Sequence, residues 1–168
     1  MTDQHQPTIA AKHELDRLMD AFFRAVSFDA GERPAYQIST LFIEMGLLIK
    51  NSSATPEISS VAQFIEPRLA LVSSGALTSF RELELSAITE CFGNVAHRFS
   101  LYTKFGTLNG APFEGRGMIS TQFIMTPAGW KISVMAWDDE RPGLSIPVHY
   151  QATTEDRTAQ APSLTEGV

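Results

Sequence analysis

The sequence predicts an α+β fold in which about three N-terminal helices pack on a curved antiparallel sheet and form a cone. Two patterns support this. Apolar residues recur at helical spacing in the first half of the chain, and beyond residue 79 they alternate with polar residues over long stretches, as strands require. Turn-forming residues divide that second part into a meander of four strands.

The first helix is predicted between Pro7 and Gly31. Its apolar positions recur every three or four residues and share one face: Leu15, Leu18, Met19, Phe22, Phe23 and Val26. Pro34 is suited to open a short second helix, because a first-turn residue needs no N–H. The run Leu41–Ile49 predicts two short buried strands, a hairpin hinged at Gly46.

The third helix is expected to begin at Thr55-Pro56-Glu57, where a hydroxyl cap precedes a proline and a carboxylate. Gly75 suits its end. Pro67 lies inside this run and removes one helical hydrogen bond, so we expect a kink or break near Glu66.

Four long strands follow between Ser79 and Asp138. Three short segments mark the turns between them: Gly93-Asn94, Asn109-Gly110 and Pro127-Ala128-Gly129. Strands longer than the usual 5–6 or so residues must twist and curl, and Gly115 and Gly117 are placed where a strand can bend. Leu83 and Leu85 alternate with Glu82 and Glu84, which predicts that these two glutamates lie at a solvated edge.

The length of 168 residues fits one domain. We expect a cone-shaped domain over residues 9–140. Residues 1–8 are expected to be a flexible N-terminus, and residues 141–168 an exit segment followed by a disordered polar tail.

Composition excludes several classes of function. A net charge of −6 without a basic run argues against nucleic-acid binding. One cysteine, Cys91, cannot form an intrachain disulfide, and neither a signal-peptide pattern nor a membrane-length apolar run is found. The four histidines lack the spacing of metal ligands, so neither a metal nor a cofactor is predicted. We therefore expect a cytoplasmic protein that contacts neither nucleic acid nor membrane.

The order of the predicted elements resembles that of a known superfamily. A long helix, a short helix, a hairpin containing Leu41-Phe42, a third helix and a meander ending in the segment 129–137 follow one another. This order resembles the nuclear transport factor two-like superfamily, the cystatin-like α+β cone fold that ketosteroid isomerases, scytalone dehydratase and SnoaL-type polyketide cyclases share. The resemblance covers about residues 10–139. It implies a ligand or substrate in the cone and dimers that pair through their sheets.

The resemblance argues against the chemistry of ketosteroid isomerases. It places Lys50 where those enzymes have an aspartate base, and Phe22 and Thr121 where they have two oxyanion donors. A cation, a hydrocarbon and a hydroxyl cannot perform that proton transfer. We therefore expect a protein that binds a small, largely apolar molecule; the alternative is a cofactor-free isomerase, dehydratase or polyketide cyclase.

The resemblance also implies a pocket with a few polar groups among apolar walls. Its predicted residues are Arg98, Tyr102, Thr121, Phe123, Asp138 and Phe22. Arg98 could bind a ligand carboxylate, or it could form a buried ion pair with Asp138 or Glu90. The enzymatic alternative would use Tyr102, Arg98 and Asp138.

The opposite face of the same strands is strongly apolar. Apolar patches beyond a few hundred Å² usually mark an interface, so we predict a homodimer through this face. Its predicted residues are Val95, His97, Phe99, Leu101, Met135 and Trp137. His97 could be a base, although a lone histidine on a strand is more typical of an interface hydrogen bond.

Overall fold

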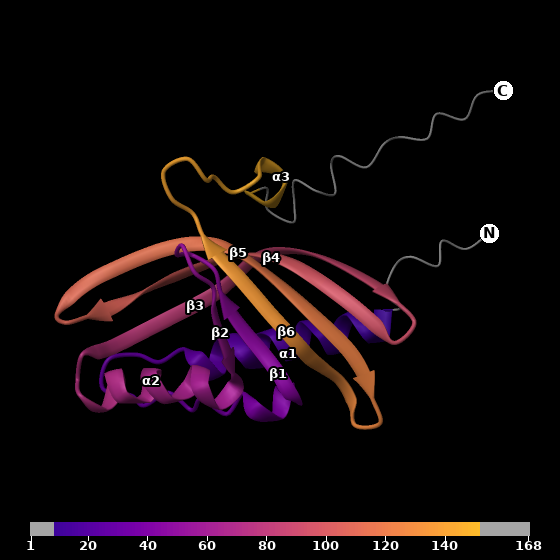
Figure 1. Cartoon of the computed structure of the whole chain (residues 1–168), viewed down its shortest axis with the longest axis horizontal. Coiled ribbons are helices and arrows are strands. Elements are labelled where there is room, and N and C mark those ends of the chain that lie inside the picture. The colour runs from indigo at the N-terminus through magenta and orange to yellow at the C-terminus, as the bar shows by residue number, and fades with distance from the viewer. Residues whose placement is uncertain (1–8, 152–168) are drawn as a thin grey trace.

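A strongly curved sheet forms the centre of the molecule in the computed structural model, which describes residues 9–151 (Figure 1). Its six strands lie in the order β2-β1-β6-β5-β4-β3. They are β1 (Phe42–Lys50), β2 (Glu57–Ser60), β3 (Leu77–Phe92), β4 (Val95–Leu108), β5 (Ala111–Thr126) and β6 (Gly129–Asp139). The predicted flexible start, residues 1–8, and the predicted tail beyond residue 151 lie outside the described residues.

Helices cover both faces of the sheet. They are α1 (Ile9–Val26), the 3-10 helix η1 (Ser39–Leu41), α2 (Val61–Ser73) and α3 (Val148–Gln151). The first two α-helices lie under the concave face, and α3 lies on the convex face (Figure 1). The α+β class is thus confirmed. The short second helix is η1, which begins five residues after the predicted opening at Pro34.

The meander forms at the predicted turns. Strands β3 to β6 pair antiparallel with their sequence neighbours, across Gly93-Asn94, Asn109-Gly110 and the Pro127-Ala128 turn. The sheet as a whole is mixed, because β1 pairs parallel to β6. The prediction of a purely antiparallel sheet was therefore wrong at this one junction.

The N-terminal hairpin differs from the prediction. Residues 42–50 form one strand with an irregular pairing to β6 between Phe42 and Leu47, not two strands hinged at Gly46. A Cβ on Gly46 would lie 2.8 Å from Cδ1 of Phe42, so the glycine admits the phenyl ring here. The antiparallel partner of β1 is the four-residue strand β2, which is too short to show an alternating pattern.

Helix α2 begins later than predicted and continues through its proline. The cap is Ser60 rather than Thr55: Ser60 Oγ accepts from the Gln63 N–H at 3.3 Å, and Gln63 Oε1 accepts from the Ser60 N–H at 2.9 Å. The expected break near Glu66 is absent from this helix. Pro67 is exposed, and the helix is continuous past it to Ser73.

The core lies between α1 and the concave face of the sheet. The predicted apolar stripe of α1 is confirmed at five of its positions, which are at most 5% exposed: Leu15, Met19, Phe22, Phe23 and Val26. They belong to one cluster with sheet residues such as Phe42, Phe123 and Ile132.

An irregularity in β6 reverses the faces of that strand. Phe123 pairs with Ile132 and Gln122 with Val134, so Ser133 has no partner in the register. Ile132 and Met135 therefore face the same side although they are three residues apart, and both belong to the core. The prediction that Met135 and Trp137 lie on the outer face was wrong for this reason: Met135 is 1% exposed and Trp137 packs against the core.

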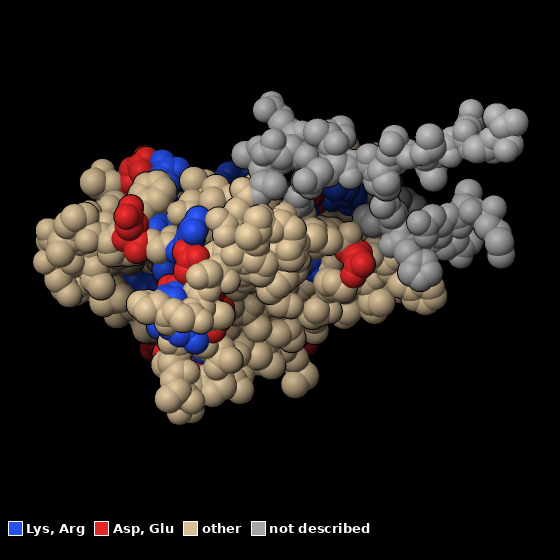
Figure 2. Space-filling view, turned by 90° about the horizontal axis from the view of Figure 1, so that it is seen from above, with Lys and Arg blue, Asp and Glu red and all other residues tan. Residues whose placement is uncertain are grey.

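The chain after β6 covers part of the convex face. Leu101 is 3% exposed and clusters with Ile146 and Tyr150, so it is not available to a second subunit. Val95 and Phe99 remain on this face, and His97 pairs there with Glu90. Seen from above, basic and acidic side chains are interspersed over the uncovered part of the molecule (Figure 2). The homodimer stays a prediction.

Gly117 in β5 provides the first test of the packing. A Cβ there would lie 2.7 Å from Cζ of Tyr102 and closer still to the Asp138 carbonyl oxygen. We expect Gly117→Ala to lower the free energy of unfolding by about 1–3 kcal/mol, as overpacking does, measured by urea denaturation. Gly115→Ala is the matched control, because the nearest atom to its Cβ is Lys104 Cε at 3.4 Å. Equal losses in both variants would contradict this account.

Candidate functional site

A cavity of about 170 Å³ lies between the two N-terminal α-helices and the sheet. It is lined by Phe22, Val26, Tyr36, Lys50, Phe64, Arg68, Leu77, Phe80, Glu82, Lys104, Ile119, Met135 and Trp137. Most of these side chains are apolar. Phe64 of α2 meets Trp137 of β6 edge to face, with ring centroids 6.0 Å apart. The cavity therefore has an aromatic wall.

Four charged side chains reach this cavity from four different elements. Glu82 lies on β3, Lys104 on β4, Arg68 on α2 and Lys50 on β1. Glu82 and Lys104 are direct partners in the register of β3 and β4, which places side chains about 5 Å apart at their Cβ atoms. The carboxyl and the ammonium group are thus neighbours on the concave face.

Glu82 has an unusual acidity for a carboxyl group. Burial raises its pKa to about 7, against the smaller lowering effects of Lys104 and Arg68. Within the part of the chain that the structure describes, no side chain or N–H donates a hydrogen bond to its carboxylate. Both its protonated and its ionised forms are therefore populated at neutral pH, as a proton-transfer group requires.

Lys104 forms an ion pair with Asp139. Its Nζ lies 2.7 Å from Asp139 Oδ1, and the hydroxyl of Tyr102 donates to the same oxygen. Burial, and then the bond to Asp139, raise the pKa of Tyr102, so its phenol is a neutral donor at any physiological pH. The two donors fix the carboxylate of Asp139 beside the cavity.

Arg68 is fixed by its own helix. Its guanidinium lies 3.5 Å from the centroid of the Phe64 ring, and Nη1 donates to the Phe64 carbonyl oxygen at 2.7 Å. Burial lowers the pKa of Arg68, opposed by Tyr36 and Glu82. The planar cation is thus presented beside the aromatic wall.

Tyr36 completes this side of the cavity in a rare backbone conformation. Its φ is +42°, in the left-handed region that a bulky residue seldom adopts. Its N–H donates to the Ala25 carbonyl oxygen at 3.0 Å, which ties the segment after α1 to the end of that helix. Burial raises the pKa of the Tyr36 hydroxyl.

The residues predicted to line the pocket are distributed over four places. Phe22 lines the cavity. Tyr102, Thr121 and Phe123 are at most 1% exposed and belong to the packed interior; the Thr121 hydroxyl has no hydrogen-bond partner among the described residues. Asp138 faces outward and pairs with Arg141, a correction that follows from the reversed faces of β6. The carboxylate that meets Tyr102 is its neighbour, Asp139.

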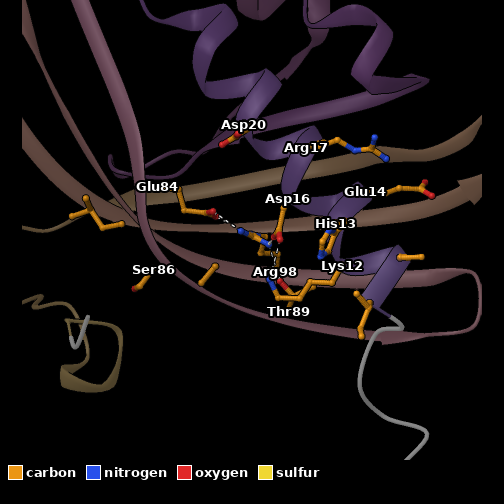
Figure 3. Close-up of a pocket in the computed structure, with 14 residues that line it drawn as sticks. Lys12, His13, Glu14, Asp16, Arg17, Asp20, Glu84, Ser86, Thr89 and Arg98 are labelled. Carbon is orange, nitrogen blue, oxygen red and sulfur yellow. Dashed lines mark hydrogen bonds and ion pairs between the residues drawn. The ribbon is translucent and has the colours of Figure 1, made fainter. Parts of the chain in front are cut away.

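Arg98 lies in a separate, open groove between α1 and β3 (Figure 3). Its Nε donates to Glu84 at 2.8 Å and its Nη1 to Asp16 at 2.6 Å. The ion-pair interpretation of Arg98 therefore holds, but with partners other than Asp138 or Glu90. The groove is the larger hollow, about 1180 Å³. We take the smaller cavity as the candidate site because the charges at the centre of the groove already neutralise one another.

Tyr102, Arg98 and Asp138 therefore do not form one catalytic set. Arg98 is committed to Glu84 and Asp16, and Asp138 points away from the phenol of Tyr102. Sequence patterns do not mark Glu82, Lys104, Arg68 and Tyr36 as a site, because these residues converge only after folding. Glu82 does not lie at a solvated edge but faces the concave side.

Comparisons with known proteins identify the fold. No protein-family model matches the chain, and curated proteins include no significant match. Among solved structures, an NTF2-like superfamily protein from Salmonella enterica is 14% identical with a TM-score of 0.66, over 80% of this chain and 94% of that one. An NTF2-like protein with a cystatin-like fold from Novosphingobium aromaticivorans is 15% identical with a TM-score of 0.59, over 91% and 90%.

A candidate scytalone dehydratase from the same Novosphingobium species is 10% identical with a TM-score of 0.64, over 84% of this chain and 89% of that one. The chain has the NTF2-like, cystatin-like fold. In residues 9–151, no helix is long and apolar enough to cross a membrane. The same residues contain no group of three or more histidine, cysteine or acidic side chains that could hold a metal ion.

The acidity of Glu82 predicts a pH dependence of stability. The folded pKa of about 7 lies above the ordinary value of 4.5, so the folded state binds more protons between these two values, and the free energy of unfolding falls as pH rises through them. Relative to Glu82→Gln, the wild type should lose about 2 kcal/mol between pH 5 and pH 8. Urea denaturation at each pH measures this.

Glu114→Gln on the exposed side of β5 is the control, because that variant should show the same pH dependence as the wild type. A wild type whose stability changes with pH in parallel with that of Glu82→Gln would contradict the assignment.

Proposed function

We propose that this protein binds a small molecule with an apolar body the size of one ring and an oxygen-rich end. The observation that carries this proposal is the cavity itself, which combines an aromatic wall with cations from separate elements. Its volume of about 170 Å³ is close to the roughly 150 Å³ of an engineered apolar cavity that binds benzene.

The composition of the cavity orients such a ligand. Phe22, Phe64 and Trp137 offer a surface for the ring, while Lys104 and Arg68 offer donors for oxygen atoms. Arg68 is the more specific of the two cations, because its planar fork matches a carboxylate. The fold supports a role of this kind, since one protein that shares it is a candidate scytalone dehydratase.

Ligand binding should be visible in the fluorescence of Trp137. We expect titration with benzoate to quench the wild type but not Trp137→Phe, which keeps only the buried Trp130. Val26→Phe should weaken binding at least tenfold, because the added ring occupies part of the cavity. Val95→Phe on the convex face is the matched control and should bind as the wild type does. Unchanged affinity in Val26→Phe would contradict the proposed site.

A second candidate function is proton transfer by a cofactor-free enzyme. Glu82 favours it, as a carboxyl beside two cations that could stabilise an enolate oxygen. The arrangement differs from that of ketosteroid isomerases, whose positions are occupied here by Lys50, Phe22 and Thr121. The substrate would be a carbonyl compound of one ring.

Hydrogen exchange tests this activity directly. In deuterated buffer at neutral pH, the wild type should accelerate exchange of the C–H protons next to the carbonyl of cyclohexanone, followed by proton NMR. Glu82→Gln should lower the enzymatic rate by a factor of about 10²–10⁴, the usual contribution of a general base. Glu114→Gln should leave it unchanged. Exchange at the wild-type rate in Glu82→Gln would exclude this carboxyl as the base.

A further inference from the structure

Glu82 introduces a difficulty for the binding of an anion at this site. A ligand carboxylate that reaches Lys104 and Arg68 must approach the carboxyl of Glu82, because all three line one cavity and Glu82 pairs with Lys104 in the sheet register. Two carboxylates that share a site of low polarity cannot both be ionised without a large cost, so one of them takes up a proton.

The charged and titratable groups around Glu82 determine which carboxyl is protonated. Tyr36 precedes η1, Lys50 is on β1, Arg68 on α2, Lys104 and Tyr102 on β4, and Asp139 on β6. Glu82 also borders a neighbouring hollow whose charged residues are Asp20 and Arg24 of α1, Glu32 after that helix, and Arg81 and Glu84 of β3. The Lys104 ammonium group forms an ion pair with Asp139, and Nζ of Lys50 lies 3.7 Å from Oε1 of Glu57. Arg68 also lowers the pKa of Glu82, but burial raises it more, so a second anion in the cavity favours the protonated carboxyl.

Resting on the proposed function, we propose that the site binds a monocyclic carboxylate together with a proton, which Glu82 takes up. Binding moves one proton. Glu82 gains one proton from solvent and donates it as a hydrogen bond to the ligand carboxylate, while that carboxylate accepts from the Lys104 ammonium and the Arg68 guanidinium. No covalent bond to the ligand forms.

The ligand rather than Glu82 stays ionised because it is the stronger acid. Free carboxyl groups titrate near pH 4, whereas Glu82 is already half protonated at about pH 7. Proton uptake per ligand should therefore be close to zero at pH 5.5, about one half at pH 7 and close to one at pH 8. By linkage, the affinity for the carboxylate should fall as pH rises above 7, by up to about tenfold per pH unit.

Calorimetric titration of the full chain with benzoate tests this proposal. Heats measured at pH 5.5, 7 and 8, each in two buffers with different ionisation enthalpies, give the number of protons taken up. The wild type should show the rising series. Glu82→Gln should bind benzoate with no uptake and with little dependence on pH, and Glu114→Gln should match the wild type. Benzyl alcohol, which carries no charge, should bind without uptake.

The outcomes separate this inference from the proposed function. Benzoate binding without proton uptake in the wild type, or with the same uptake in Glu82→Gln, would overturn the inference and leave ligand binding intact. Binding of benzyl alcohol but not of benzoate would overturn the choice of a carboxylate. If neither compound binds, both proposals fail. If the glutamine variant does not fold, the wild-type buffer series still tests the inference, because binding of benzoate at pH 8 without proton uptake would overturn it.

Discussion

One unpaired residue in the register of β3, Leu85, determines which side chains face the inside of the cone. Glu84 pairs with Tyr102 and Ser86 with Leu101, so the strand turns over between them. Leu83 and Leu85 are consequently 46% and 52% exposed, while Glu82 and Glu84 face the concave side. Full burial of a leucine stabilises a protein by about 1.5–3 kcal/mol, so this inversion costs stability. The candidate site exists because of it.

The two inward glutamates are neutralised to very different extents. Glu84 accepts from the Arg98 guanidinium and, at 2.5 Å, from the Ser100 hydroxyl, so its charge is well satisfied. Removing Arg98 would leave that carboxylate unpaired, which is the costly way to break a buried pair. Glu82, two residues away on the same face, lacks such bonds within residues 9–151 and keeps an accessible proton equilibrium. The same residue type is thus fully paired at one position and has a raised pKa at the other.

Local signals in the sequence were sufficient for the helical stripe of α1 and for the turns of the meander, since periodicity and turn chemistry act over a few residues. The faces of the strands were a different matter. Alternation assigns residues to the two faces of a strand in turn, so an unpaired residue reverses the assignment of every residue beyond it. Neither Leu85 nor Ser133 has a side chain that marks an irregular pairing. Phe22, which the family resemblance assigned to the pocket, lines the cavity. Asp138 was named where the structure has Asp139, the carboxylate that meets Tyr102.

Burial raises the pKa of Glu82 toward neutrality, and Asp139 adds to this effect. Lys104 is the cross-strand partner of Glu82 and already lowers its pKa; without Asp139 it would pair with Glu82 more closely and lower that pKa further. The ammonium group instead lies 2.7 Å from Asp139, which the buried phenol of Tyr102 holds in position. Asp139 also acts on Glu82 directly, because its negative charge raises the pKa of that carboxyl. A carboxylate outside the cavity thereby adds to the effect of burial on the protonation of the one inside it.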